Sequence, residues 1–265
     1  MRVVDEAKLS ALDAGCDARA ASLAVAEEIF AVVDVLDSSA GLRRAFTDPA
    51  SSAEARVGLG ERIFGTKVSA DAQWVLGQAL DLRWRNGHCL SDALERQGVR
   101  LVLRAAQQAG KLDAVIADLG GFGSAVREHD ALREALRDTS FDLAARRSLV
   151  GRITEGKVSE FSEVLLARAV GARERTYRLT LERYLQLAAD LRSRQIARVT
   201  VAKPLTAAQE ERLRSLLAAQ AGAEIDLQIE LDPSVLGGIR VQFGNDRIES
   251  TVAARLDDVH RQLTA

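Results

Sequence analysis

The sequence has 265 residues, of which 47% are hydrophobic and only 4% aromatic, and its 36 basic and 38 acidic residues give a net charge of −2 at pH 7. This length and composition exclude a disordered chain, and the scarcity of aromatic residues favours packed helices over a β-sandwich. Because basic and acidic residues are interleaved, no face is predicted to bind polyanions, and we expect no nucleic-acid partner.

The N-terminal part carries neither a targeting segment nor a redox motif. Its first ten residues lack an apolar core, and no apolar stretch approaches the roughly 20 residues that span a bilayer, so we expect no direct membrane insertion. Cys16 and Cys89 have no cysteine or histidine neighbour at the spacing of metal ligands. Both are predicted to be unpaired thiols.

An internal repeat organises the chain up to about residue 194. Residues 42–85 align without a gap with residues 132–175, ninety positions later, and 16 of the 44 pairs are identical, where about 4 would be expected by chance. The identical pairs include Arg56 with Arg146, Leu59 with Leu149 and Ile63 with Ile153. We interpret the repeat as a duplication, and expect two clusters of short helices in the same order. The paired Leu and Ile are predicted to occupy equivalent core positions.

Each copy is predicted to contain an amphipathic helix followed by shorter ones. Apolar residues recur at spacings of four, three and four, at Val25, Ile29, Val32 and Leu36 and again at Val115, Leu119, Phe122 and Val126. Such spacings place each set on one helical face. Pro49 and the segment DTSF at 138–141 are predicted to end helices, and Ser69 and Ser159 to cap the next ones. Residues 181–191 give the clearest closing helix.

From Gln195 the pattern changes to alternating strands. Residues 196–201 form a β-branched run, and residues 225–231 alternate apolar with polar side chains. Between them, Thr206 and Gln209 have the spacing of a capping box at the start of a helix. The buried face of that helix is predicted to consist of Leu213, Leu216 and Leu217.

The glycine-rich stretch DPSVLGGIRVQFGNDRIE, at 232–249, raises the possibility of a phosphate-binding loop. It contains neither GxxxxGK[ST] nor GxGxxG, and Gly237 and Gly238 lead into an alternating strand rather than a helix. The GND at 244–246 is typical of a turn, so we predict a β-hairpin here. Ser250 is predicted to cap a final helix with apolar residues at Val252, Leu256, Val259 and Leu263.

No motif nominates catalytic, cofactor-binding or metal-binding residues. His88, His129 and His260 lie in different segments, and none is spaced from another potential ligand as metal sites require. The predicted fold class is therefore α+β, mostly α-helical, with a duplicated helical-bundle N-terminal region and a small α/β C-terminal domain with a β-hairpin. The predicted domains are residues 1–110, 111–194 and 195–265.

The C-terminal stretch resembles the signature of the delta subunits of bacterial F-type ATP synthases, which are related to the mitochondrial oligomycin-sensitivity-conferring protein (OSCP). Matching positions include the run Leu236-Gly237-Gly238-Ile239, then Gly244, Ile248 and Val252, then Arg255-Leu256. Glu249 stands where Asp is commoner in the family. The segment FTDPASS at 46–52 resembles a loop of the family's N-terminal bundle, and the extra ninety residues resemble the long forms of actinobacteria.

This resemblance implies a non-catalytic stator subunit without a cofactor, at the cytoplasmic face of the cell membrane. The helical region would hold N-terminal segments of the α subunits, and residues 195–265 would bind the C-terminal end of the b subunit. Since the sequence shows no membrane anchor, b is expected to be a separate polypeptide. Two alternatives stay open at this point: a helical-repeat scaffold unrelated to ATP synthase, and an enzyme whose site is built from unremarkable residues.

Partner-contacting residues are harder to predict than the partners. Tryptophan is enriched in binding hot spots, so Trp74, with its neighbour Val75, is the candidate contact in the first copy. The alternative, which large aromatic residues favour, is a place for Trp74 in the core of the bundle.

Overall fold

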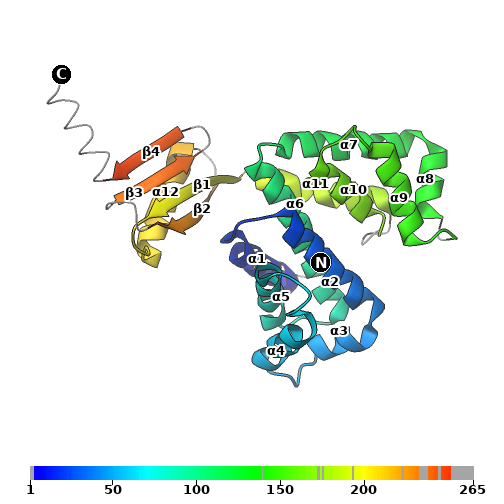
Figure 1. Ribbon diagram of the computed structural model, residues 1–265, viewed down its shortest axis with the longest axis horizontal. Helices are drawn as coiled ribbons and strands as arrows, with labels where there is room; N and C mark the ends of the chain where they lie inside the picture. The colour runs from blue at the N-terminus through cyan, green and yellow to red at the C-terminus, as the bar shows by residue number, and fades with distance from the viewer. Residues whose placement is uncertain are drawn as a thin grey trace. The chain divides into compact units, whose positions relative to one another are not determined.

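The computed structural model describes residues 3–138, 140–171, 174, 176–192, 194–221, 224–232, 238–243 and 246–251. It divides the chain into two compact units (Figure 1). The first, which we call the helical unit, comprises residues 1–16 and 21–189, and the second, the sheet unit, comprises residues 17–20 and 190–265. The predicted mostly α-helical fold is confirmed.

The helical unit repeats five helices in the same order. After α1 (Val3–Asp17), the first copy contains α2 (Leu23–Ser38), α3 (Ala40–Phe46), α4 (Ala53–Phe64), α5 (Ala70–Asp81) and α6 (Gly87–Gln108). The second copy contains α7 (Leu112–Glu128), α8 (Asp130–Arg137), α9 (Leu143–Thr154), α10 (Glu160–Ala169) and α11 (Tyr177–Arg192). The first residues of corresponding helices are 89 or 90 positions apart, so the helix order expected from a duplication is confirmed.

Corresponding helices also begin with corresponding side-chain contacts. The Ser69 hydroxyl accepts a hydrogen bond from the amide of Ala72 at the start of α5, and Ser159 does the same for Ser162 at the start of α10. The predicted caps are therefore confirmed. In each copy, a carboxylate also accepts a hydrogen bond from the amide of the capping serine. Glu28 accepts from the Ser69 amide at 2.8 Å, and Asp118, ninety residues after Glu28, accepts from the Ser159 amide at 3.2 Å.

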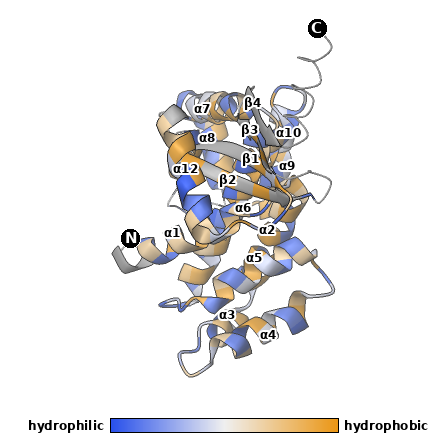
Figure 2. Ribbon diagram, turned by 90° about the vertical axis from the view of Figure 1, so that its left-hand side faces the viewer, coloured by the Kyte–Doolittle hydropathy of each residue, from blue (hydrophilic) through white to orange (hydrophobic). Residues whose placement is uncertain are grey.

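The predicted apolar stripes of α2 and α7 are all buried, but the prediction for α4 and α9 is wrong. Leu59 and Ile63, like Leu149 and Ile153, are half-buried rather than core residues. The buried positions lie one residue later, at Gly60 and Phe64 in α4 and at Val150 and Thr154 in α9. The two copies thus bury equivalent positions, shifted along the helix from those the sequence pattern favoured. Hydrophobic and hydrophilic residues alternate along α4 and α5 in Figure 2, as expected for helices with one buried face.

Helix α6 is the central element of the helical unit. It has 22 residues, which corresponds to about 33 Å, and it packs against α2, α3 and α5 of its own copy and against α7 and α10 of the second. Residues 97–106 are buried on every side of the helix. The last helix of the first copy therefore serves as a shared core for both copies.

The sheet unit consists of four strands and one described helix. They are β1 (Arg194–Val201), α12 (Ala207–Ala221), β2 (Glu224–Leu231), β3 (Gly238–Phe243) and β4 (Asp246–Thr251). The strand order is β2-β1-β3-β4; β1 pairs with β2 in parallel, while β1 with β3 and β3 with β4 are antiparallel. The parallel pair needs a crossover, which α12 supplies. The core of the sheet unit consists of Val199, Val201, Leu217, Ile225 and Val241.

Local predictions for the sheet unit had mixed outcomes. The capping box is confirmed, because Gln209 Oε1 accepts from the Thr206 amide at 2.8 Å and the Thr206 hydroxyl accepts from the Gln209 amide at 3.4 Å. Leu216 was wrongly placed in the buried face, since it is 63% exposed and Leu217 is the buried leucine. Ser250, predicted to cap the final helix, lies within β4. The turn at 244–245 and the predicted final helix at 252–263 lie outside the described residues.

Candidate functional site

A groove between α4 and α5 of the first copy contains Trp74. Its volume is about 420 Å³, and most of its lining is apolar or small, with Val57, Gly60, Ala70, Trp74, Leu76, Gly77 and Leu80 joined by Glu61, Gln73, Gln78 and Asp81. Trp74 is half-buried and lies on this groove, whereas Val75 is only 4% exposed and faces the bundle core. Of the two predicted contacts, Trp74 is therefore the accessible one, and the partner role of both stays a prediction.

Arg56 fixes the shape of this groove from inside the bundle. Its buried guanidinium donates to the backbone oxygens of Leu80, at 2.9 Å, and Asp81, at 3.1 Å. These carbonyl groups lie at the end of α5, where the helix itself supplies no amide to pair with them. A third bond reaches the Ser51 oxygen at 2.8 Å, just before α4 begins. At Gly60, a Cβ would come within 2.6 Å of a methyl group of Leu80, so a larger residue would force the Leu80 side chain or one of the two helices to move.

Replacing Arg56 by methionine is expected to lower the free energy of unfolding by about 2–3 kcal/mol, because the carbonyls of Leu80 and Asp81 lose a charged donor inside the protein. Urea unfolding can be followed by tryptophan fluorescence, since both tryptophans, Trp74 and Trp84, belong to the helical unit. The matched control is Arg62→Met on the exposed side of the same helix, which should change stability by less than about 0.5 kcal/mol. Equal effects of both variants would contradict the assigned role.

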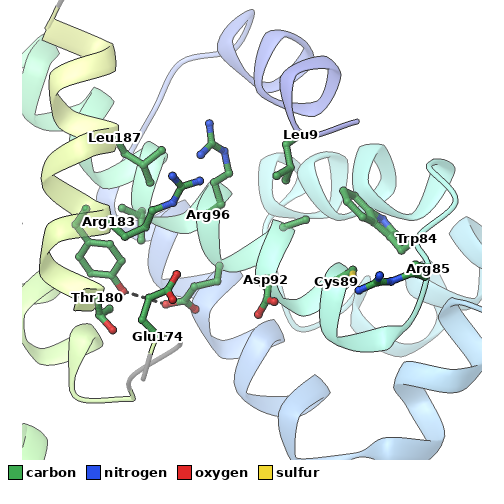
Figure 3. A pocket seen from close by; sticks show the side chains of 14 residues that line it. Leu9, Trp84, Arg85, Cys89, Asp92, Arg96, Glu174, Thr180, Arg183 and Leu187 are labelled. Atoms are coloured by element: carbon green, nitrogen blue, oxygen red, sulfur yellow. Dashed lines mark hydrogen bonds between the residues drawn. The ribbon is translucent and has the colours of Figure 1, made fainter. Parts of the chain in front are cut away.

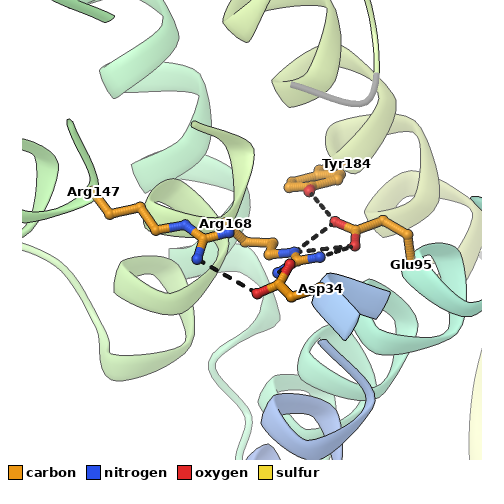
Figure 4. A network of polar contacts seen from close by, with 5 residues as sticks. All are labelled: Asp34, Glu95, Arg147, Arg168 and Tyr184. Atoms are coloured by element: carbon orange, nitrogen blue, oxygen red, sulfur yellow. Dashed lines mark hydrogen bonds and ion pairs between the residues drawn. The ribbon is translucent and has the colours of Figure 1, made fainter. Parts of the chain in front are cut away.

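A cluster of charged side chains joins the two copies (Figure 4). Arg168 on α10 makes a two-pronged contact with Glu95 on α6, with Nε 3.0 Å from both carboxylate oxygens and Nη2 2.6 Å from Oε2. Its Nη1 donates to Asp34 on α2 at 2.7 Å, and Arg147 on α9 lies 3.6 Å from the other oxygen of Asp34. The hydroxyl of Tyr184 on α11 donates to Glu95 at 3.2 Å. One arginine of the second copy therefore holds two helices of the first.

The centre of the cluster, where Arg168 meets Glu95, is buried. The Arg168 and Glu95 side chains are 9% and 6% exposed, and the guanidinium also lies over the ring of Phe30, 4.7 Å from its centre. Burial disfavours the charged guanidinium, but the hydrogen bonds and charge of Glu95, helped by Asp34, outweigh it and raise the pKa of Arg168 above its ordinary value. The guanidinium thus remains a charged, structural link rather than a proton donor.

Sequence reasoning missed this cluster, although the repeat held a usable signal. Arg147 and Arg168 are aligned with Val57 and Gln78 of the first copy, so two uncharged positions of one copy are arginines in the other. If such an arginine is buried, it needs a counter-charge that its uncharged counterpart does not need. Nothing in the sequence, however, identified Asp34 and Glu95 as those partners, because they lie 134 and 73 residues away.

A second pocket, of about 450 Å³, lies among α1, α6 and α11 (Figure 3). It combines an apolar lining, which includes Leu9, Trp84 and Leu187, with charged residues of both signs. Its carboxylate Glu95 is already bound by Arg168 and Tyr184. The pocket therefore presents mixed surface chemistry, and its most buried carboxylate already serves the link between the copies.

Potential metal ligands are not gathered in the part of the chain that the structure describes. No group of three or more His, Cys, Asp or Glu side chains there could hold a metal ion. His88 and His129 are exposed in separate segments, and His260 lies outside the described residues. Among the described helices, none is both long and apolar enough to cross a bilayer.

Neither cysteine forms a disulfide in the structure, with Cys16 buried in α1 and Cys89 half-buried in α6. We expect titration of the unfolded, unreduced chain to count two thiols, because neither residue has a disulfide partner within the chain. The native chain should react more slowly at Cys16 than at Cys89, since burial shields the Cys16 sulfur. A count of zero in the unfolded chain would contradict this expectation.

Comparisons with known proteins place this architecture in one family. A family model described as ATP synthase delta (OSCP) subunit matches residues 101–263, which cover the second copy and most of the sheet unit. The chain is 42% identical to the ATP synthase subunit delta of Cutibacterium acnes, over 95% of this chain and 96% of that protein. It is 40% identical to the subunit delta of Streptomyces avermitilis, over 91% and 89% of the two chains. These relatives therefore match the first copy as well.

Among solved structures, a chain of the cryo-EM structure of the Toxoplasma gondii mitochondrial ATP synthase hexamer aligns with 63% of this chain and 95% of its own length. Its sequence identity of 20% and TM-score of 0.28 are too low to support an argument. This chain belongs to the ATP synthase delta (OSCP) subunit family, the non-catalytic peripheral-stalk subunits of the F-type ATP synthase.

Proposed function

We propose that the chain connects the catalytic head of the ATP synthase to its peripheral stalk at the cytoplasmic face of the cell membrane. The helical unit binds N-terminal segments of the α subunits, and the sheet unit binds the C-terminal end of the b subunit. The chain thereby resists the torque that the rotor exerts on the head during ATP synthesis. It acts by binding alone, without a cofactor of its own.

The observation that best supports this division of labour is the presence of two compact units with separate cores. The helical unit has its core around α6, and the sheet unit has its own core around Val199 and Val241. Units with separate cores can bind different partners independently, which is what a connector requires. Within the helical unit, the cluster around Arg168 ties both copies together, so load applied to one copy is carried to the other.

The test divides the chain at the boundary between the units. Residues 1–189 are expected to bind the purified catalytic head but not the b subunit, and residues 190–265 to bind the b subunit but not the head. Circular dichroism of each fragment must first show helix or mixed helix and strand, respectively. Size-exclusion chromatography with each partner measures binding, and the full chain should bring both into one complex. Capture of the head by residues 190–265 alone would contradict the proposal.

A further inference from the structure

The pocket among α1, α6 and α11 has the size and the lining of a small-molecule site (Figure 3). Its volume of about 450 Å³ falls within the range of ligand pockets, roughly 300–1,000 Å³. Leu9 of α1, Trp84 of the segment before α6 and Leu187 of α11 line it, and each is at most 8% exposed. The Trp84 indole donates to the Ala79 carbonyl at 2.7 Å, which holds its ring in place. The pocket therefore offers a preformed apolar surface.

The acidic residues of the lining are either exposed or already neutralised. Asp92 and Glu174 are exposed, so water screens their charges. Glu95 is buried, but Arg168, which does not line the pocket, supplies its counter-charge at 2.6 Å. Among the described lining residues, none therefore places an uncompensated carboxylate inside the pocket.

The cations of the lining are less completely balanced. Arg96 on α6 donates to Asp13 through Nε at 3.2 Å and Nη2 at 2.5 Å, but Asp13 also lies 3.3 Å from Nε of Arg100 and so serves two guanidinium groups. Arg183 on α11 is half-buried and forms no ion pair with a described side chain. Both Arg96 and Arg183 extend from their helices into the pocket in Figure 3. The interior of the pocket is therefore better suited to an anion than to a cation.

We propose that this pocket binds a small amphipathic anion, with its acidic group at Arg183 and Arg96 and its apolar body against Trp84. The planar guanidinium of arginine favours carboxylates and similar oxyanions, which accept two of its hydrogen bonds at once. Because α6 belongs to the first copy and α11 to the second, the ligand contacts both copies and stabilises their junction. Neither partner subunit takes part, so the site does not depend on the proposed function.

The test uses the isolated full-length chain and two probes that differ in charge. Decanoate joins one carboxylate to an unbranched alkyl chain, and decylammonium is its counterpart with a positive charge. Isothermal titration calorimetry measures their binding at concentrations below those at which they form micelles. We expect decanoate to bind at one site with a dissociation constant below about 1 mM, and decylammonium to bind about tenfold more weakly or worse.

Two further readouts locate the bound ligand. Cys89 lines the pocket and is half-buried, whereas Cys16 is buried and is not part of the lining. Saturating decanoate should slow the alkylation of Cys89 by iodoacetamide severalfold, because the ligand covers its sulfur, and mass spectrometry distinguishes the two cysteines. The midpoint of thermal unfolding should rise with decanoate concentration, as it does for a ligand that binds only the folded chain.

Substitutions of Arg183 test the contact with the acidic group. Arg183→Met should weaken decanoate binding about tenfold or more, because hydrogen bonds to a charged group are lost. Arg183→Lys keeps the charge and should retain part of the affinity. The matched control is Arg178→Met on the same helix, where Arg178 is exposed, pairs with Glu182 and does not line the pocket, and it should bind decanoate as the unmodified chain does. Circular dichroism and thermal unfolding without ligand verify that all three variants fold.

Four outcomes would overturn the assignment of this site. If decanoate does not bind up to about 1 mM, the pocket does not take this class of ligand. Equal affinity of Arg183→Met and the unmodified chain would show that the carboxylate binds elsewhere. Equal affinity for decanoate and decylammonium would show that the chain takes up alkyl groups without recognising charge. Undiminished alkylation of Cys89 at saturating decanoate would place the ligand outside this pocket.

Discussion

Replacing Arg168 by methionine is expected to lower the free energy of unfolding of the helical unit by about 3–5 kcal/mol, because it leaves the buried carboxylate of Glu95 without its cation. The Tyr184 hydroxyl, which donates to Glu95 at 3.2 Å, cannot replace the lost positive charge. Asp34, whose side chain is 46% exposed, can turn toward water and should add little to the loss. Urea unfolding followed by tryptophan fluorescence measures the change.

Two further variants separate the ion pair from the packing of its side chains. The double variant Arg168→Met with Glu95→Met removes both charges, and it should recover most of the stability that the single variant loses, because no unpaired charge remains buried. Arg178→Met is the matched control, since Arg178 forms an exposed pair with Glu182 one helical turn away, and its loss should cost less than about 0.5 kcal/mol. If Arg168→Met behaves like Arg178→Met, the cluster does not hold the copies together.

Replacing Gly98 by alanine is expected to destabilise the helical unit by about 1–3 kcal/mol, although alanine is the better helix former. A Cβ at position 98 of α6 would lie 2.4 Å from Cε1 of Phe30 on α2, far inside van der Waals contact. The Phe30 ring cannot easily move aside, because it is 5% exposed and the Arg168 guanidinium lies over its face. The methyl group would therefore push α2 away from α6 and disturb the link between the copies.

The same substitution at Gly121 is the control and should have the opposite sign. Gly121 is an exposed residue in the interior of α7, and a Cβ there would have nothing within 4 Å. Alanine at this position should raise stability by about 0.5–1 kcal/mol, because glycine in a helix loses more backbone freedom on folding. Chemical unfolding of the two variants compares them directly. A gain in stability for Gly98→Ala would show that the Phe30 ring can move aside, and that the packing of α2 against α6 does not require glycine at position 98.

Family membership decides between the readings that the sequence left open. The matches to the ATP synthase delta (OSCP) subunit family exclude a scaffold unrelated to ATP synthase and an enzyme in its own right. The duplication also gives this chain a first helical copy, which the residues matched by the family model do not include. The first copy lies almost entirely before residue 101, where the family model begins, and it carries the open α4–α5 groove.

The sequence alone determined the features that depend on local pattern. The repeat predicted two series of helices in the same order, because the same spacing of apolar residues must fold into the same helices. Caps at Ser69 and Ser159 and the capping box at Thr206 were predictable too, since each involves groups within three residues of one another. The stripes of α2 and α7 were read correctly because each has a full set of apolar residues on one face.

Only the tertiary structure decided which faces are buried where the pattern is short or contains charge. In α4, the buried positions are Gly60 and Phe64 and not the predicted Leu59 and Ile63. The orientation of this helix depends on Arg56, which donates to a carbonyl at the end of another helix. The link between the copies depends on Arg168 meeting Asp34 and Glu95, which are distant in the sequence and carry no local signature. Periodicity reports contacts within one helix, whereas the pairing of charges between helices depends on how the whole chain packs.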